Sequence, residues 1–240
     1  MRWFLLGGVA VLGLGCSTGF SRGEMESAVR SANPVYTSSG LSVKEIEELQ
    51  PQVSLPIRIA VAPPNISYRY WSEQNLGVWS PDEVAEIESW REPLAESGVI
   101  NDLLILPSLL VEQCEWRDPG CKLRVSREAA ARVQADALLM LNVATDLDEY
   151  VNPLSAFNIT IIGMWIAPGH HRDALTIIEG VMLDNRNEYL YAFARGEGES
   201  SIVRPLVYAD AYKAIESSRL LALQAFGKDF VRRASQLKTR

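Results

Sequence analysis

The chain has 240 residues, of which 48% are hydrophobic, and it carries 23 Lys and Arg against 30 Asp and Glu for a formal net charge of −7. Its basic residues are scattered, apart from short groups near the C-terminus such as Arg232 and Arg233. We therefore expect no nucleic-acid partner, because nucleic-acid binding needs a concentrated basic face that displaces counterions from phosphates. The length is compatible with one domain that buries a sizeable core.

The N-terminus has the organisation of a secretion signal. Arg2 precedes an apolar stretch with interspersed glycines at residues 3–14, and the segment closes on Gly15 and Cys16. As a helix this stretch is too short to cross the ~30 Å hydrocarbon core of a bilayer. We therefore predict a cleaved export signal rather than a transmembrane anchor.

This segment resembles the signal peptides of bacterial lipoproteins, whose cleavage leaves the cysteine as a lipidated N-terminus. Gly13 stands three positions before Cys16, where that family usually has Leu. The resemblance implies a signal peptide at residues 1–15, lipidation of Cys16 with palmitate, and a membrane-anchored protein. Ser17 is not the aspartate that marks retention at the inner membrane in such proteins, which favours the outer membrane, facing the periplasm.

Residues 16–41 are rich in Ser, Gly, Thr and Asn, with few apolar residues, and this composition predicts a flexible tether with a reach of roughly 25 to 30 Å. The remainder, residues 42–240, is expected to form a single globular α/β domain. Ser42 and Glu45 have the spacing of a capping box and predict a short helix. Alternating apolar residues predict a strand at 57–62, which ends at Pro63.

Helices are expected to separate the first three strands. Ser80, Pro81 and Glu83 provide an N-cap, an N1 proline and an N3 glutamate, and Pro93 predicts a kink or a restart of that helix. Residues 103–106 predict a strand buried on both faces. Further along, Ser126 is expected to cap a helix at 127–135, and residues 137–143 predict a third strand.

The pattern then changes to strands joined by short turns, which predicts an antiparallel meander. Its predicted members are residues 157–166, 174–183 and 188–194, and Gly196 and Gly198 are interpreted as a bulge or strand end. About 28 residues from Tyr208 have apolar positions at helical spacing and predict a long amphipathic helix on the sheet. The fold class is therefore α/β (α+β), with a mixed sheet in two or three layers.

Cys114 and Cys121 flank a segment with the turn-forming sequence Asp118-Pro119-Gly120. An exported chain meets an oxidising compartment, so we predict a disulfide between them that stabilises the fold by roughly 2 to 3 kcal/mol. A redox or metal pair is the alternative, although the spacing is neither Cys-x-x-Cys nor a usual zinc arrangement.

Aromatic residues gather in the segment that follows the first strand. Tyr68, Tyr70, Trp71 and Trp79 are of the types that anchor protein interfaces, and they form the candidate interface. The alternative is that the segment folds these rings back onto the edge of the sheet. Exposure to solvent decides between the two.

The sequence has no recognisable catalytic motif, and we expect a non-catalytic protein without a metal or cofactor. Its two histidines, His170 and His171, are adjacent and point to opposite faces of an extended chain. Asp146, Asp148 and Glu149 lack the glycine and the twelfth-position glutamate of a calcium loop. A nucleophile elbow, a phosphate-binding glycine loop and a dinucleotide fingerprint are all missing from the sequence.

The order of elements resembles that of a group of bacterial lipoproteins that includes the curli-secretion channel family, the lipoprotein activator of penicillin-binding proteins and the rhombotarget lipoproteins. The local matches to the last group are Leu-Pro-Ile-Arg-Ile-Ala-Val at residues 55–61, Ala-Asp-Ala-Leu-Leu at 135–139, and Met-Leu-Asp-Asn-Arg-Asn-Glu-Tyr-Leu-Tyr at 182–191. The chain ends in Gln-Leu-Lys-Thr-Arg rather than in the Gly-rich tail of many rhombotarget proteins. The resemblance implies a binding or assembly accessory protein of the cell envelope with an envelope protein as its partner. The alternatives are a subunit of an oligomeric export channel and a hydrolase that uses Asp146, Asp148 and a histidine.

Overall fold

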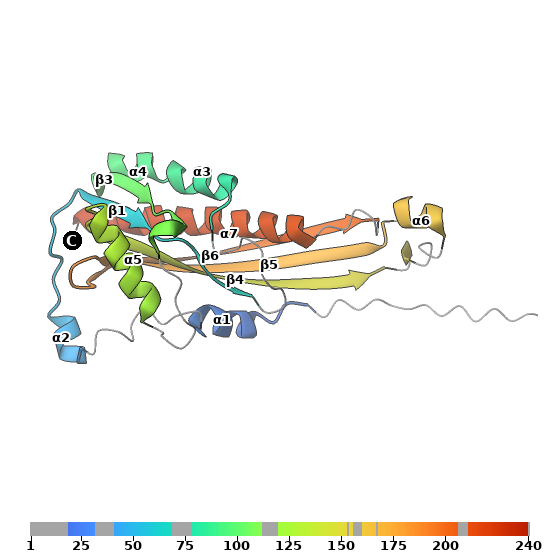
Figure 1. Ribbon diagram of the computed structural model, residues 1–240, viewed down its shortest axis with the longest axis horizontal. Helices are drawn as coiled ribbons and strands as arrows, with labels where there is room; N and C mark the ends of the chain where they lie inside the picture. The colour runs from blue at the N-terminus through green and yellow to red at the C-terminus, as the bar shows by residue number, and fades with distance from the viewer. Residues whose placement is uncertain are drawn as a thin grey trace, which may run out of the picture.

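The computed structural model describes residues 19–31, 41–68, 78–111, 120–152, 154–155, 160–166, 168–205 and 211–239. These residues form a mixed sheet in which the strands lie in the order β3-β1-β4-β5-β6, and β2 pairs with β4. Helices cover both faces of the sheet, and the long C-terminal helix runs along the strands (Figure 1). The predicted fold class, a mixed α/β fold closed by a long C-terminal helix, is confirmed.

The strands are β1 (Ile57–Val61), β2 (Asn65–Tyr68), β3 (Ile100–Ile105), β4 (Ala137–Val151), β5 (His170–Asp184) and β6 (Leu190–Arg204). The α-helices are α1 (Arg22–Ser31), α2 (Val43–Glu47), α3 (Pro81–Ser89), α4 (Arg91–Glu96), α5 (Cys121–Arg132), α6 (Ile161–Ile166) and α7 (Ala211–Ala234). Short 3₁₀ turns lie at Ser108–Leu110 and Ser235–Thr239.

The strands in the first half of the sheet run parallel, as predicted from the helices that separate them in the sequence. β1 pairs in parallel with β3 on one side and β4 on the other, and β2 pairs in parallel with β4. The prediction that β3 is buried on both faces is wrong, because β3 is an edge strand in which only Ile100 and Leu103 are buried. β2 lies where the sequence predicted only a loop.

The second half is an antiparallel meander of three long strands, β4, β5 and β6. Part of the predicted strand positions in this meander is wrong. Residues 161–166 form helix α6 rather than a strand, and residues 157–159 lie outside the described part of the chain. β4 continues to Val151 and β5 begins at His170, so the chain between them is the connection of this hairpin, and its described part includes α6.

One face of the sheet is covered by α3, α4 and α7. Trp90 packs against both Phe226 and Phe230 of α7, with ring centroids 5.8 and 5.9 Å away, and the two phenylalanine rings stack on each other. All three residues are buried. α5 covers part of the opposite face, where Leu123, Ala129 and Ala130 pack on strands β1 and β4. The result is a three-layer arrangement with the sheet in the middle (Figure 1).

Two glycines allow α7 to lie directly against β6. A Cβ atom on Gly196 would lie 2.2 Å from the carbonyl oxygen of Ala222, and one on Gly198 would lie 2.3 Å from the backbone nitrogen of Ala222. Both glycines lie inside β6, so their interpretation as a bulge or strand end is wrong. They serve the close approach of helix and strand.

Helix starts follow the sequence where capping residues are present. Capping boxes form at Ser42 with Glu45 and at Ser80 with Glu83, as predicted. The predicted restart near Pro93 occurs at Arg91, which places Pro93 in the first turn of α4, where its missing N–H costs little. Ser126 is not a cap, since α5 already begins at Cys121 and Ser126 is buried inside the helix.

Helix α1 corrects the expectation of a flexible tether over residues 22–31. Met25 and Val29 are 3% and 1% exposed and pack against Leu175 and Ile177 of β5 and Ala144 of β4. Two apolar residues at i and i+4 are enough to fix one helical face against a sheet. α1 therefore lies on the same face of the sheet as α5, opposite α7 (Figure 1).

Strand β6 forms one edge of the sheet, and the carboxylate of Asp229 on α7 bonds to the backbone of this strand. Asp229 accepts a hydrogen bond from the backbone of Arg195 on β6, and its side chain also pairs with Arg232 and Arg233. Burial raises the pKa of Asp229, but these hydrogen bonds outweigh it and hold the pKa below its ordinary value. Arg233 also lies over the ring of Phe193, 4.8 Å from its centroid.

Candidate functional site: an apolar tip and an arginine groove

The hairpin of β4 and β5 ends in an exposed apolar surface at the end of the molecule remote from α2 (Figure 1). Its large side chains are well exposed: Val151 44%, Leu154 45%, Trp165 50%, Ile166 67% and Val203 44%. We refer to these five residues as the apolar tip. In the sheet, Val151 pairs with His170 and His170 pairs with Arg204, which places Val203 one position from the last rung.

The composition of this connection matches its exposure. Residues 151–169 contain no Asp, Glu, Lys or Arg. Arg204 lies on the last rung of the sheet, beside Val203. Further from the tip, Arg172 pairs with Glu149 at 2.7 Å, and Asp173 accepts from the hydroxyl of Tyr150 at 3.0 Å. The sequence analysis missed this surface because it assigned the segment to a strand, although the run without charges was the available signal.

Asn152 fastens the two ends of the connection to each other. Its backbone N–H donates to the carbonyl of Gly169 at 2.9 Å, and its side-chain amide donates to the carbonyl of Pro168 at 3.0 Å. Its side-chain oxygen accepts from the backbone N–H of Leu154 at 2.9 Å. Gly169 is required here, since a Cβ atom would lie 2.6 Å from the backbone of Ser155.

The N-terminal segment reaches the sheet close to the apolar tip. The backbone N–H of Gly19 donates to the carboxylate of Asp148 at 3.2 Å, three positions before the end of β4. From there α1 runs away from the tip: Arg22 pairs with Glu197 at 2.7 Å, and Glu26 pairs with Arg195 at 3.0 Å. Because Glu197 lies nearer than Arg195 to the tip end of β6, the start of α1 is the end that faces the tip.

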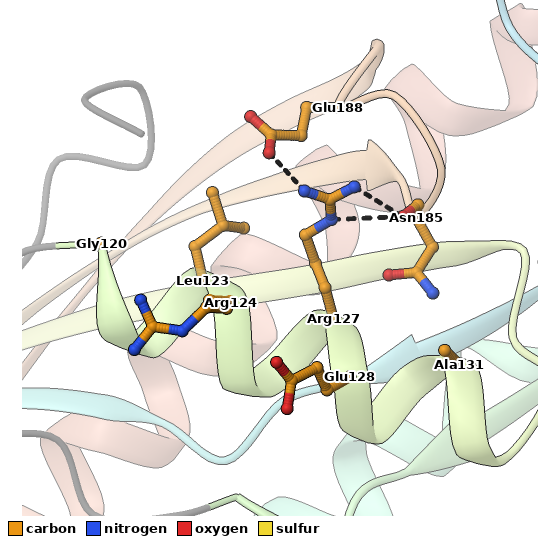
Figure 2. A pocket seen from close by; sticks show the side chains of 8 residues that line it. All are labelled: Gly120, Leu123, Arg124, Arg127, Glu128, Ala131, Asn185 and Glu188. Carbon is orange, nitrogen blue, oxygen red and sulfur yellow. Dashed lines mark hydrogen bonds and ion pairs between the residues drawn. The ribbon is translucent and has the colours of Figure 1, made fainter. Parts of the chain in front are cut away.

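A second surface is a groove of about 460 Å³ beside α5 (Figure 2). Figure 2 shows Arg124, Arg127 and Glu128 from α5 and Asn185 and Glu188 from the turn between β5 and β6. Gly120, Leu123 and Ala131 complete the lining. The groove combines both signs of charge with an apolar surface from Leu123 and Ala131, which suits a peptide segment better than a purely apolar ligand.

Arg127 holds the turn that forms one wall of this groove. Its guanidinium donates to the carbonyl of Asn185 through Nε at 3.1 Å and through a terminal nitrogen at 2.9 Å, and to the carbonyl of Arg186 at 3.0 Å. It also pairs with the carboxylate of Glu188. These bonds occupy the directional donors of the guanidinium, so Arg127 stabilises the wall rather than offering a site to a ligand.

The predicted aromatic interface is only partly within the described residues. Trp79 folds back onto the sheet: its indole N–H donates to the carbonyl of Ala62 at 3.1 Å, and its ring packs against the main core. The backbone of Tyr68 belongs to β2, and Tyr70 and Trp71 lie outside the described residues. The candidate interface therefore stays a prediction, with Trp79 in a packing position.

Of the two cysteines in the predicted disulfide, Cys121 lies within the described residues. Cys121 is the first residue of α5 and is 8% exposed. Cys114 lies outside the described residues, as does Cys16, the predicted lipidation site. The disulfide and the lipidation both stay predictions.

The histidines and nearby carboxylates are placed on strands rather than gathered in a pocket. His171 stacks on Tyr150 with ring centroids 4.6 Å apart, and its Nε2 lies 3.0 Å from the side-chain nitrogen of Asn152. Asp148 accepts from Gly19, and Glu149 pairs with Arg172. Over the described ranges, no three His, Cys, Asp or Glu side chains come together in a geometry that fits a metal ion.

A buried ion pair joins α7 to α3. Arg219 and Glu83 lie 2.9 Å apart with side chains 6% and 4% exposed, and Glu83 also caps α3 by accepting from the backbone of Ser80 at 2.8 Å. Beside it, the hydroxyl of Thr176 bonds to those of Thr145 and Ser218 at 2.9 and 2.8 Å. The three hydroxyls bond to one another and the ion pair joins the two helices, whereas the Nε of Arg219 is buried without a hydrogen-bond partner among the described residues.

Among the helices of the described segments, none has both the length and the apolar character needed to span a bilayer.

Comparison with known proteins gives no family. The sequence matches none of the known protein families and none of the curated proteins. Among solved structures, the chain is similar to the C-terminal domain of LpoB from Salmonella enterica, at 11% identity and a TM-score of 0.31 over 64% of this chain and 89% of that one. It is also similar to a neuraminyllactose-binding hemagglutinin homologue from Helicobacter pylori, at 8% identity and a TM-score of 0.35 over 80% and 96% of the two chains. A third match is the PelC dodecamer from Paraburkholderia phytofirmans, at 14% identity and a TM-score of 0.28 over 73% and 91%. At these TM-scores the similarities define neither a family nor a function for this chain.

Proposed function

We propose that this protein is a non-catalytic lipoprotein of the cell envelope, anchored through a lipid on Cys16 and acting as a binding or assembly accessory protein. The lipoprotein-like signal at residues 1–16 supports the anchor. The signal has no charged residue after Arg2 and ends in a cysteine, and a lipoprotein signal requires both features. We propose the outer membrane, on its periplasmic side, as the location, because Ser17 follows the cysteine.

The observation that carries the proposal is the docking of the segment directly after Cys16. Gly19 bonds to Asp148, and α1 packs Met25 and Val29 into the sheet. A segment that served only as a linker to a signal peptide would not need to bury two apolar side chains on the folded domain. The docking holds the chain from Gly19 onward against the sheet, which supports an anchor close to the folded domain.

The anchor is tested in cells that process lipoproteins. The full chain and the Cys16→Ala variant are expressed with a radiolabelled palmitate precursor, and membranes are separated from soluble protein. We expect the wild-type chain to carry label and to sediment with membranes, and the variant to lose the label. Membrane association of Cys16→Ala without label would contradict the lipid anchor.

For the binding role we propose an envelope protein partner, with the segment around Tyr70 and Trp71 and the groove beside α5 as the candidate contacts. The mixed charge of the groove, with Arg124 and Glu128 on its rim, supports a polar protein segment as the ligand. The test is crosslinking in intact envelopes from a residue in the groove, such as Ala131, followed by identification of the captured protein. The same placement on Lys213, outside the groove, is the control, and an identical product pattern from both positions would count against the groove.

Two other functions are weaker. A hydrolase that uses Asp146, Asp148 and a histidine would need these groups in one pocket, whereas His171 stacks on Tyr150 and Asp148 accepts from Gly19. A subunit of an oligomeric export channel would be a multimer, so its test is the native mass of the purified protein in detergent.

A further inference from the structure

We propose that the apolar tip lies on the surface of the phospholipid bilayer that holds the acyl chains of Cys16. The protein then touches its membrane at two points, the lipid and the tip. This inference rests on the lipid anchor proposed above, and it adds a contact surface and the chemistry of its ligand.

The length of chain between the anchor and the fold is the first argument. Cys16 precedes Gly19 by three positions, and three extended residues span at most about 11 Å. Gly19 is fixed to Asp148, and Val151 lies three residues further along β4, or about 10 Å at 3.3 Å per residue. A bilayer that holds a lipid on Cys16 therefore lies within about 20 Å of the tip.

The direction of α1 is the second argument. α1 runs from the level of Asp148 towards that of Asn142, whose side chain donates to the carbonyl of Val29 at 3.4 Å. The end of the N-terminal segment that leads to Cys16 is therefore the end that lies nearer to the apolar tip. The opposite end of the molecule, where α2 lies, is held away from the membrane (Figure 1).

The chemistry of the tip fits a bilayer surface. Trp165 and Ile166 expose half or more of their side chains on a helix of six residues, which is too short to span a membrane but suited to lie in its interface. Tryptophan favours the level of the lipid headgroups. Since residues 151–169 have no charged side chain, insertion of this surface desolvates no ionised side chain of that segment. His170 and Arg204, on the last rung of the sheet, stand where headgroup phosphates would lie.

The test uses the full-length lipidated protein in vesicles of phosphatidylcholine and phosphatidylglycerol. Ile166→Cys is labelled with an environment-sensitive fluorophore, and quenching by brominated lipids is measured. The matched control is Ile46→Cys on α2, which replaces an equally large aliphatic side chain that is 51% exposed at the other end of the molecule. Wild-type protein treated with the same reagent gives the background from the remaining cysteines.

We expect quenching at position 166 to exceed that at position 46 by about three-fold or more, because only the tip label lies in the ~5–10 Å boundary layer of the bilayer. Equal quenching at the two positions, with the protein still lipidated and bound to vesicles, overturns the tip contact and leaves the anchor intact. A chain that carries no lipid and leaves both labels unquenched overturns the anchor and the tip contact together. A chain without lipid whose label at 166 is still quenched overturns the anchor alone and supports the tip contact.

A second copy of the chain is the competing occupant of the tip. It is detected in the same labelled protein in detergent without vesicles. A shift in fluorophore emission at position 166 that grows with protein concentration, and is absent at position 46, overturns the bilayer as the ligand of the tip.

Discussion

Gly19 and Asp148 are 129 positions apart in the sequence, yet the backbone N–H of the first donates to the carboxylate of the second at 3.2 Å. This contact and the packing of α1 together attach the N-terminal segment to the β4–β5 hairpin, close to the end of β4. A tether of 26 residues was expected, but the attachment leaves only the residues before Gly19 between Cys16 and the fold. With the lipid anchor proposed on Cys16, about three residues rather than a random coil would set the distance between the domain and its anchor.

The docking of α1 depends on Met25 and Val29. Replacing both with Ala removes most of the apolar contact of α1, and buried Met→Ala changes alone cost about 2–5 kcal/mol. We expect the amides of residues 22–31 to exchange with deuterium at least ten-fold faster, because the local opening free energy falls by more than 1.4 kcal/mol.

The control for that experiment is Ser27→Ala, which lies on the exposed side of the same helix. It should leave the exchange of residues 22–31 unchanged or slow it slightly, since Ala has the higher helix propensity. Equal acceleration in the control and in the double variant would contradict the docking.

The close contact of α7 with β6 requires glycine at position 196. The Cβ atom of a Gly196→Ala variant would meet backbone atoms of Ala222 and Phe226 at 2.2 and 2.3 Å, and backbone atoms cannot rotate away. We expect a loss of about 3 kcal/mol or more in the free energy of unfolding, measured by urea denaturation. Gly23→Ala in α1, whose Cβ would meet nothing within 4 Å, should instead be neutral or stabilising by about 0.5–1 kcal/mol.

The ion pair between Glu83 and Arg219 is buried, so the loss of one partner should cost more than the pair itself contributes. We expect Arg219→Met to reduce the free energy of unfolding by about 3–5 kcal/mol, because it leaves the carboxylate of Glu83 without its partner. The double variant with Glu83→Gln should recover part of this loss, and a double-mutant cycle measures the coupling. Additive losses would contradict the coupling, and removal of the exposed pair of Lys44 and Glu48 should have little effect.

Tyr191 gives the fold a pH dependence in the alkaline range. Burial, together with the hydrogen bond to Asp184 at 2.9 Å, raises the pKa of its hydroxyl above the ordinary value of 10.0. A raised pKa in the folded state means that this stabilisation is complete below pH 10 and is lost as the pH rises from 10 towards the folded pKa. Tyr191→Phe should cost about 0.5–1.5 kcal/mol at pH 7 and make unfolding less sensitive to pH above 10.

The control for the alkaline prediction is Tyr212→Phe, at a tyrosine that is 46% exposed. It should keep the wild-type slope of stability against pH between 10 and 12. A variant Tyr191→Phe with that same slope would show that the pH dependence arises elsewhere.

The parts of the fold that the sequence predicted are those with local signals. Ser42 and Ser80 mark helix starts by their own side chains, and the buried run at 137–143 marks a strand whatever its partner. Ser126 has the same residue type as these caps, but Ala129 and Ala130 pack against β1 and β4, and that packing extends α5 back to Cys121. Tertiary contacts outweigh the local signal there.

The candidate site was less predictable, because its features are long-range. The segment at 157–166 is apolar enough for a strand, but β4 extends to Val151 and pairs with β5, and residues 161–166 form α6 in the connection between these strands. In α1, Met25 and Val29 are too few to indicate a buried face, and their burial depends on a sheet more than 110 residues away. The groove depends on the meeting of α5 with the turn after β5, which no local pattern indicates.

A protein held on a membrane meets its neighbours at high local concentration, and the long strand β6 lies at the edge of its sheet. Open edges of this kind pair with those of adjacent chains and seed fibres. The bond from the backbone of Arg195 to Asp229 withdraws one of the groups that such pairing needs, and the side chain of Arg233 stands over the same edge. Helix α7 thus covers part of the β6 edge against pairing with a strand of another chain.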